Sequence, residues 1–156
     1  KELEKGHVRF NAIGRLQDLP HEVQEKIQRN VRRTENNPGL VLTLALSYSS
    51  RVEMTDAVKR LCQRVAAGNL KVDEITEDDL ARELYTSGMP DPDLLIRTSG
   101  EMRISNFLLW QISYTEIHVS DKYWPDFRKE DFLEAVKDYQ KRERRFGRAG
   151  TAASTR

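Results

Sequence analysis

Hydrophobic residues in this chain alternate between two spacings, one typical of strands and one typical of helices. Apolar residues at every second position over 7–13 predict a strand that ends at Gly14. The segment 40–46, with the sequence LVLTLAL, is almost wholly apolar, as a central parallel strand covered on both faces would be. Two further short apolar segments predict strands over 93–96 and 117–119.

Between these strands the apolar residues recur at helical spacing. A helix opens at Pro20, and a second helix, over 51–67, is predicted to bury Cys62 on its apolar face. Thr76 and Asp79 have the spacing of a capping box and predict the start of a third helix. Two more helices are predicted, a short one over 107–114 and a long one over 128–146. This alternation predicts an α/β fold with a mostly parallel sheet flanked by helices.

The length of 156 residues fits one domain, which we expect over 1–148, followed by a flexible tail over 149–156. Residues 1–5 resemble the end of a helix already in progress. Four strands are also few for a parallel sheet with this much helix around it. We therefore expect that upstream sequence of the full domain is missing from this chain.

The charges nearly cancel, with 26 basic and 25 acidic side chains and a net charge of +1. This balance argues against a protein that binds nucleic acid through a concentrated basic surface. The apolar segments are far shorter than the roughly 20 residues that a membrane span requires. The single cysteine excludes an internal disulfide, and the start of the chain has no secretory signal pattern, so we expect a cytoplasmic protein.

Ligands of open α/β sheets gather at the carboxyl ends of strands, which directs attention to the loop 97–106. It contains two arginines, three hydroxyl side chains and a glycine, and it leads into the predicted helix 107–114. An arginine fork pairs with two phosphate oxygens, and a helix N-terminus favours an anion. We therefore predict a phosphate-binding site centred on Arg97 and Arg103. The alternative is an ordinary loop in which one of these arginines pairs with Glu101.

Three other segments carry candidate chemistry. Glu116 precedes the strand 117–119 and is an oxygen ligand of the kind that Mg²⁺ prefers beside a bound diphosphate, with a solvent-facing glutamate as the alternative. The loop 47–51, SYSSR, is a second candidate anion site, with a plain helix N-cap as the alternative. The segment 141–148 has five basic residues, which a solvated helix end, a second phosphate clamp or attraction to an acidic membrane surface would each explain.

Longer stretches of the sequence resemble the signature of the cis-prenyltransferase family. The segment 93–111, DLLIRTSGEMRISNFLLWQ, carries most of the likeness. The resemblance continues in Ile13-Gly14, the loop 48–51, Tyr114, Glu116, WPDF at 124–127 and RRFG at 144–147. It covers nearly the whole chain.

The resemblance implies an enzyme that adds isopentenyl diphosphate repeatedly to farnesyl diphosphate and makes a long cis-polyprenyl diphosphate, such as undecaprenyl diphosphate. It implies that isopentenyl diphosphate is bound by Arg97, Arg103, Ile104 and Ser105. It also implies that Glu116 helps to bind Mg²⁺ across a homodimer.

The triplet RFG at the end of the likeness resembles a terminal motif that reaches the substrate site of the partner subunit, which makes Arg145 and Gly147 candidate substrate-binding residues. A lipid product further implies peripheral contact with the inner face of the membrane.

The sequence departs from the family pattern in three places. The family's Asp-Gly-Asn-Gly-Arg-type phosphate loop, its catalytic aspartate and its first strand have no counterpart here, so the catalytic residue is expected outside this chain. Serines replace the more usual asparagine and paired glycines at Ser47, Ser49 and Ser50, and Met102 stands where some relatives have a histidine near the metal. We therefore expect the later portion of the enzyme, carrying the isopentenyl diphosphate site and the dimer interface, and unable to turn over alone.

Two other hypotheses remain open. The chain could be a non-catalytic subunit of a heteromeric prenyltransferase, which the sequence immediately upstream of Lys1 would distinguish from an enzyme. It could also be an unrelated phosphate-binding α/β module, which would bind nucleotides in place of isopentenyl diphosphate.

Overall fold

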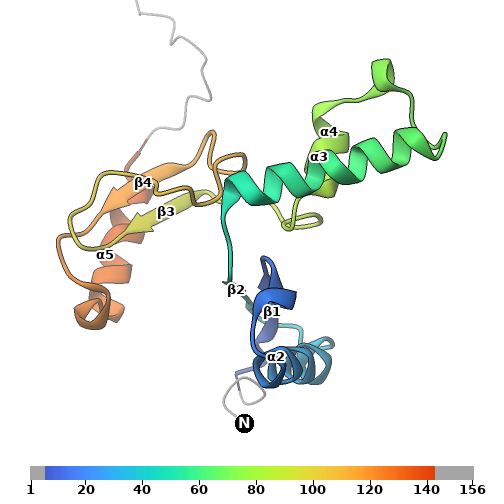
Figure 1. Ribbon diagram of the computed structural model, residues 1–156. Coiled ribbons are helices and arrows are strands. Elements are labelled where there is room, and N and C mark those ends of the chain that lie inside the picture. The colour runs from blue at the N-terminus through green and yellow to red at the C-terminus, as the bar shows by residue number, and fades with distance from the viewer. Residues whose placement is uncertain (1–5, 143–156) are drawn as a thin grey trace, which may run out of the picture. The chain divides into compact units, whose positions relative to one another are not determined.

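The computed structural model describes residues 6–142, so Arg145, Gly147 and the predicted tail lie outside the described residues. The chain divides into two compact units, Lys1–Met89 and Pro90–Arg156, and each is described by itself. Both units contain parallel strands and helices, in agreement with the predicted α/β class (Figure 1). The prediction of one domain over 1–148 stays a prediction.

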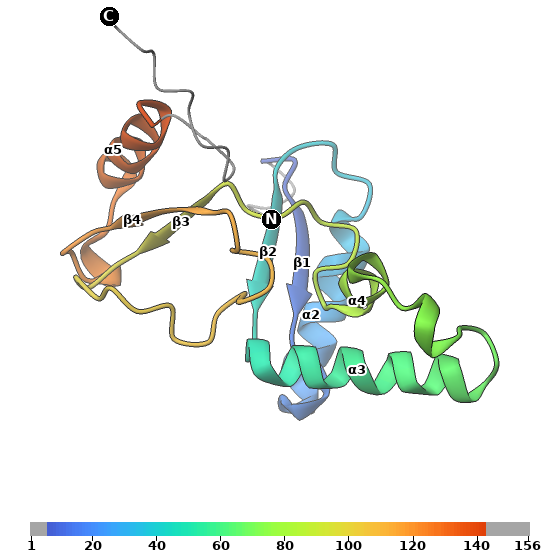
Figure 2. The same ribbon diagram turned by 90° about the horizontal axis from the view of Figure 1, so that it is seen from above.

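The first unit is built on two parallel strands joined by a helix. Strand β1 (Arg9–Ile13) pairs with β2 (Val41–Ala45), and α2 (His21–Thr34) is the crossover between them, as the sequence predicted. Helix α2 lies against β1 in both views (Figures 1 and 2). A buried hydrogen bond joins the two elements, since Phe10 N–H donates to Thr34 Oγ1 at 2.9 Å.

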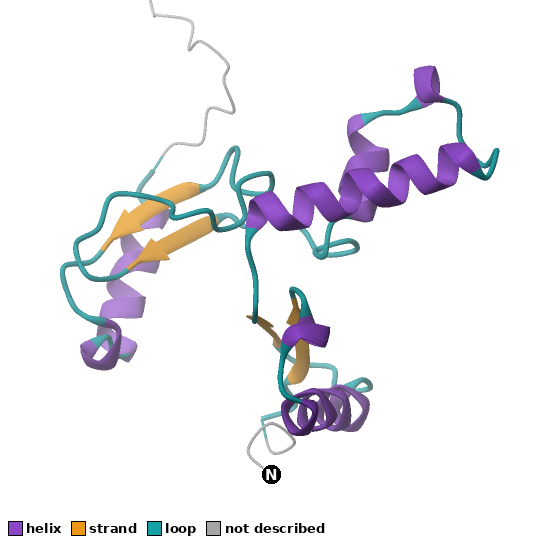
Figure 3. Ribbon diagram, viewed as in Figure 1, coloured by secondary structure: helices purple, strands orange, loops and turns teal. Residues whose placement is uncertain are grey.

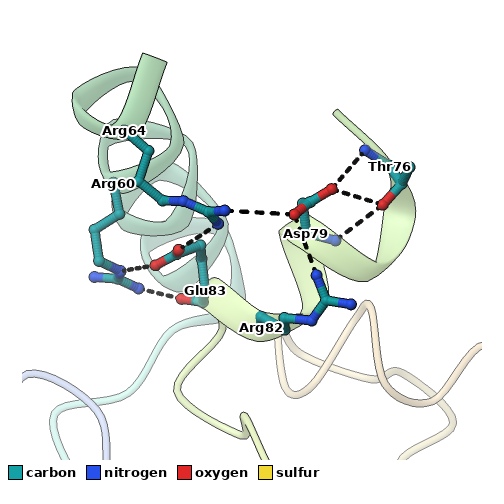
Figure 4. A network of polar contacts seen from close by, with 6 residues as sticks. All are labelled: Arg60, Arg64, Thr76, Asp79, Arg82 and Glu83. Carbon is teal, nitrogen blue, oxygen red and sulfur yellow. Dashed lines mark hydrogen bonds and ion pairs between the residues drawn. The ribbon is translucent and has the colours of Figure 1, made fainter. Parts of the chain in front are cut away.

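Two more helices complete the first unit. Helix α3 (Ser50–Ala66) follows β2, and α4 (Glu77–Glu83) packs against it. Thr76 and Asp79 form the predicted capping box at the start of α4. Two arginines of α3, Arg60 and Arg64, contact the Glu83 carboxylate at the end of α4, which ties the helices together (Figure 4).

Side-chain burial in this unit differs from the sequence prediction in two places. Cys62 was predicted in the core but is exposed, because the buried side of α3 is the one that carries Ala57 and Leu61. Strand β2 was predicted to be covered on both faces, yet Leu42 and Leu44 are each 40% exposed in the described residues. An apolar strand sequence indicates that the strand can be buried. It does not show which other elements pack against the strand.

The second unit also contains a parallel pair of strands. Strand β3 (Leu94–Arg97) pairs with β4 (Glu116–Val119), and helix α5 (Lys129–Gln140) packs against β4. A 3₁₀ turn, η3 (Trp124–Asp126), precedes α5. Helix α5 begins where the Asp131 carboxylate accepts the Arg128 N–H at 2.8 Å.

The predicted helix over 107–114 is wrong. The connection between β3 and β4 is a loop with turns, drawn in teal in Figure 3. Positive φ angles at Ser105, Asn106 and Leu108, of 53°, 61° and 48°, interrupt the right-handed backbone that a helix needs. Ile112 N–H donates to Leu108 O at 3.0 Å and closes a turn that does not continue.

In the part of the chain that the structure describes, no helix has both the length and the apolar character to span a membrane.

Candidate functional site

The loop after β3 brings its two arginines to one carboxylate. Arg97 is the last residue of β3, and its Nη2 lies 2.7 Å from Glu101 Oε2. Arg103 Nη2 lies 2.5 Å from the same oxygen. The ion-pair alternative is therefore correct as a description of this structure, and both arginines take part in it.

The contact with Glu101 uses only some of the N–H groups of the two guanidinium groups. A guanidinium has five N–H groups, and one nitrogen of each accounts for the contact with Glu101. Arg97 Nε is buried and has no hydrogen-bond partner among the described residues. Arg103 is 69% exposed. The hydrogen bond from Arg97 and the charge of Arg103 hold the pKa of the Glu101 carboxyl below its usual range. The site is thus a pair of cations joined by one carboxylate.

Two backbone N–H groups of this loop, those of Ser99 and Gly100, are already engaged in hydrogen bonds. Ser99 N–H donates to Lys122 O at 2.8 Å, and Gly100 N–H donates to Ser120 O at 2.9 Å. A Cβ at Gly100 would lie 3.2 Å from Asp121 Oδ1, so the glycine allows the loop to pack on the segment after β4. No helix follows the loop, and a helix dipole therefore makes no contribution. The arginine side chains are therefore the donors of this loop that the structure points to for an anion.

The other expected contacts lie on the same loop. Ser105 is exposed, and Ile104 is half-buried. Both therefore belong to the segment that carries Arg103, and their role in binding substrate stays a prediction.

Glu116 lies away from the arginines within this unit. It is the first residue of β4 and pairs with Leu94 at the start of β3, whereas Arg97 pairs with Val119 at the other end of the ladder. Three residues along a strand correspond to about 10 Å. The sequence analysis expected Glu116 to lie beside the bound diphosphate. Within one chain, however, the strand register places Glu116 and Arg97 at opposite ends of the β3–β4 pair.

The Glu116 carboxylate has a partner of its own. Arg142 Nη1 lies 2.9 Å from Glu116 Oε2, and Arg142 also donates to Ile117 O and to Asp138. His118 Nδ1 lies 3.1 Å from the same Asp138 carboxylate. The described residues contain no group of three or more histidine, cysteine or acidic side chains that could hold a metal ion. Glu116 can therefore offer a metal one carboxylate, in addition to whatever the substrate supplies.

A second set of polar residues lies at the carboxyl ends of β1 and β2. Arg15 N–H donates to Ser47 O at 3.2 Å. The Arg15 side chain forms a two-pronged contact with Asp56 on α3, at 3.0 and 2.8 Å. Tyr85 Oη donates to the same carboxylate at 2.6 Å. The contacts with Arg15 and then Tyr85 hold the pKa of Asp56 far below its usual range.

The loop 47–51 is organised by a buried glutamate that the sequence analysis missed. Glu53 is 0% exposed, and it accepts hydrogen bonds from Tyr48 Oη at 2.5 Å and from the Tyr85 N–H at 2.8 Å. Ser50 is also fully buried, which removes its hydroxyl from contact with a ligand. Ser49 is the N-cap residue of α3, but its side chain makes no capping hydrogen bond. A glutamate in the first turn of a helix is usually explained by its favourable interaction with the helix dipole. The sequence around Glu53 therefore gave no indication that this side chain is buried.

Comparisons with known proteins show the family to which the chain belongs. Residues 1–147 match the prenyltransferase family of undecaprenyl diphosphate synthases. The chain belongs to this family. It is 50% identical to an isoprenyl transferase of Geobacter sulfurreducens over 99% of its own length and 63% of the relative's. It is also 50% identical to a geranylgeranyl-diphosphate-specific tritrans,polycis-undecaprenyl-diphosphate synthase of Pyrococcus horikoshii, over 90% of this chain and 53% of that protein.

A solved structure shares the fold. The lavandulyl diphosphate synthase of Lavandula x intermedia, crystallised with dimethylallyl diphosphate, is similar with a TM-score of 0.88 and 37% identity, over 90% of this chain and 61% of that chain. The prenyltransferase chain described here thus spans about three-fifths of the length of the relatives that it matches.

Proposed function

We propose that this chain carries the isopentenyl diphosphate site of a cis-prenyltransferase, which condenses isopentenyl diphosphate with an allylic diphosphate to build a long cis-polyprenyl diphosphate. Farnesyl diphosphate is the allylic substrate, and undecaprenyl diphosphate is the expected type of product. Membership of the family supports the class of reaction. The observation that carries the assignment of the site is the convergence of Arg97 and Arg103 on one anionic oxygen at the end of β3.

The chemistry needs cations near the diphosphate groups. Negative charge accumulates on the leaving diphosphate as the allylic C–O bond breaks, and cations positioned beforehand stabilise that charge. Isopentenyl diphosphate keeps its own diphosphate in this step. Arg97 and Arg103 hold that group and so orient the double bond that attacks the allylic carbon. Ile104 and Ser105 are proposed contacts of the same substrate. Arg145 and Gly147 are proposed to reach the partner subunit's site.

We propose that Mg²⁺ is required and that Glu116 supplies one of its ligands. Magnesium is usually held by one or two carboxylates together with substrate phosphates. Glu116 would be such a carboxylate, and its Oε2 would exchange the contact with Arg142 for the ion. When bound, the ion would neutralise charge on a diphosphate. Because Glu116 and Arg97 lie at opposite ends of the β3–β4 ladder, a site that uses both draws them from two chains of a homodimer.

The chain is further proposed to be inactive alone, because none of its residues matches the family's catalytic aspartate loop. We also propose a cytoplasmic location, with peripheral contact to the membrane through the lipid product. The second hypothesis, a non-catalytic subunit of a heteromeric prenyltransferase, predicts that the arginines bind no substrate.

Substitution of the arginines tests the site. Arg97→Ala and Arg103→Ala should each weaken the binding of isopentenyl diphosphate by about 1.5–3 kcal/mol, the usual loss for a hydrogen bond to a charged group. Isothermal titration calorimetry on the full chain measures this change directly. Arg82→Ala is the control, because Arg82 is likewise an exposed arginine paired with an acid, Asp79, but belongs to the first unit. Equal affinities for all three variants would refute the proposed site.

A further inference from the structure

The carboxylate between the two arginines occupies the position that a substrate phosphate needs. Glu101 Oε2 lies 2.7 Å from Arg97 Nη2 and 2.5 Å from Arg103 Nη2. Guanidinium groups form charged hydrogen bonds of this kind with phosphate oxygens as well as with carboxylates. We propose that Glu101 is a displaceable counter-ion, which neutralises the arginine pair when the site is empty and must leave it when a diphosphate binds. This inference rests on the proposed function of Arg97 and Arg103.

The charges of the three side chains favour displacement. Two guanidinium groups and one carboxylate leave a net charge of +1 at the site. A diphosphate is a multivalent anion, so a carboxylate that stayed in place would repel it at close range. If Glu101 leaves, the full charge of both arginines becomes available to the ligand. Glu101 therefore competes with the substrate for the same donors.

The surroundings of Glu101 allow it to leave. Its side chain is 33% exposed, and Arg103 is 69% exposed, so both can move into solvent without unpacking a core. The contact uses one oxygen of the carboxylate. Arg97 Nε, buried and without a partner among the described residues, is a donor that this ion pair leaves unsatisfied. A ligand with several oxygens can satisfy more of these donors than one carboxylate oxygen does.

Glu83 also contacts two arginines, but through both of its carboxylate oxygens and inside a packed pair of helices. Glu83 contacts Arg60 through Oε2 and Arg64 through Oε1, at 3.2 and 3.1 Å, and its backbone carbonyl also accepts a hydrogen bond from Arg60 (Figure 4). Its side chain is 17% exposed, and it joins the end of α4 to α3. Both carboxylate oxygens of Glu83 are thus held in place by arginines of the packed helix α3. It supplies a matched control for Glu101.

The test measures the affinity of the full chain for inorganic pyrophosphate by isothermal titration calorimetry. Glu101→Gln keeps the shape of the side chain and removes its charge. We expect it to bind pyrophosphate about three- to tenfold more tightly, because a carboxylate that competes at a partly exposed site is removed. Glu101→Asp keeps the charge and should stay within about threefold of the wild-type affinity. Glu83→Gln should lower the melting temperature and leave the affinity unchanged.

A double-substitution cycle locates the effect. The gain from Glu101→Gln should become smaller when Arg103→Gln is also present, because one of the two guanidinium groups for which Glu101 competes has then been removed. Wild-type chain that binds pyrophosphate, together with unchanged or weaker binding by folded Glu101→Gln, would overturn the inference and leave the proposed function standing. Wild-type chain that does not bind pyrophosphate at all would refute the proposed site, and the inference with it.

Discussion

Asp56 shows how strongly a single acidic residue can depend on its neighbours in this protein. Its carboxylate accepts two hydrogen bonds from Arg15 and one from Tyr85. Arg15 and then Tyr85 lower the pKa of Asp56 far below the value of an exposed aspartate. The three residues come from the end of β1, from α3 and from the segment after α4, so this carboxylate joins three parts of the first unit.

The sign of the pKa change fixes a prediction for stability against pH. Because the pKa is lowered in the folded state, the stabilisation is present above the unfolded pKa, near 4, and is lost as the pH falls through the folded value. Asp56→Asn should therefore lower the free energy of unfolding at pH 7 by about 2 kcal/mol. The difference from wild type should shrink below about pH 4 as the wild type loses its own stabilisation.

Urea denaturation of wild type and Asp56→Asn at pH 7 and at pH 3 measures the two differences in the free energy of unfolding. Glu74→Gln is the matched control, since Glu74 forms an exposed ion pair with Lys71 and should cost little at either pH. A stability difference for Asp56→Asn that is the same at both pH values would contradict the assignment.

At the scale of elements, the end of β1 depends on a glycine. Gly14 has a φ angle of +113°, and a Cβ at this position would lie 2.0 Å from Leu46 O. The close approach lets the loops after β1 and β2 meet, as the hydrogen bond from Arg15 N–H to Ser47 O shows. Any side chain at position 14 would push the two strand ends apart.

Gly14→Ala should consequently destabilise the first unit by about 2 kcal/mol or more, through backbone strain and steric overlap together. Gly68→Ala is the control, because Gly68 has a φ angle of +74° but no heavy atom within 4 Å of its hypothetical Cβ. It should cost about 1 kcal/mol, for the strained backbone alone. Chemical denaturation of both variants measures the difference, and equal losses would show that the overlap at position 14 is relieved by movement of the loop.

At the scale of the whole molecule, the strand register separates two proposed site residues. Arg97 and Glu116 lie at opposite ends of the β3–β4 ladder in one chain. The proposed homodimer would bring Arg97 of one chain and Glu116 of the other to one site. A symmetric dimer would then have two equivalent composite sites, each with an arginine from one chain and a glutamate from the other.

Mixing two inactive variants tests this in the intact protein. Arg97→Ala and Glu116→Gln homodimers should each have low activity, and the Glu116→Gln protein should need more Mg²⁺. A mixed dimer has one site with both substitutions and one site with neither, so random mixing should restore about a quarter of wild-type activity. Activity that stays at the mean of the two homodimers would mean that Arg97 and Glu116 do not form a shared site. A normal Mg²⁺ titration of Glu116→Gln would remove Glu116 from the metal site.

The sequence by itself determined most of the local elements of this protein and indicated the chemical character of a candidate site. The apolar spacing located α2, the capping box located the start of α4, and the arginines of the loop after β3 indicated an anion site. These features depend on residues within a few positions of one another, so a single stretch of sequence contains the information.

The tertiary structure decided which groups meet. The apolar segment 107–114 forms turns because its preceding residues adopt left-handed backbone angles, and Gly100 serves the contact with Asp121 where a phosphate was expected. The burial of Glu53 and the shared contact of Arg97 and Arg103 with Glu101 depend on loop geometry and on partners elsewhere in the fold. Residue type and spacing specify what a side chain can bind, whereas long-range packing specifies which partner is within reach.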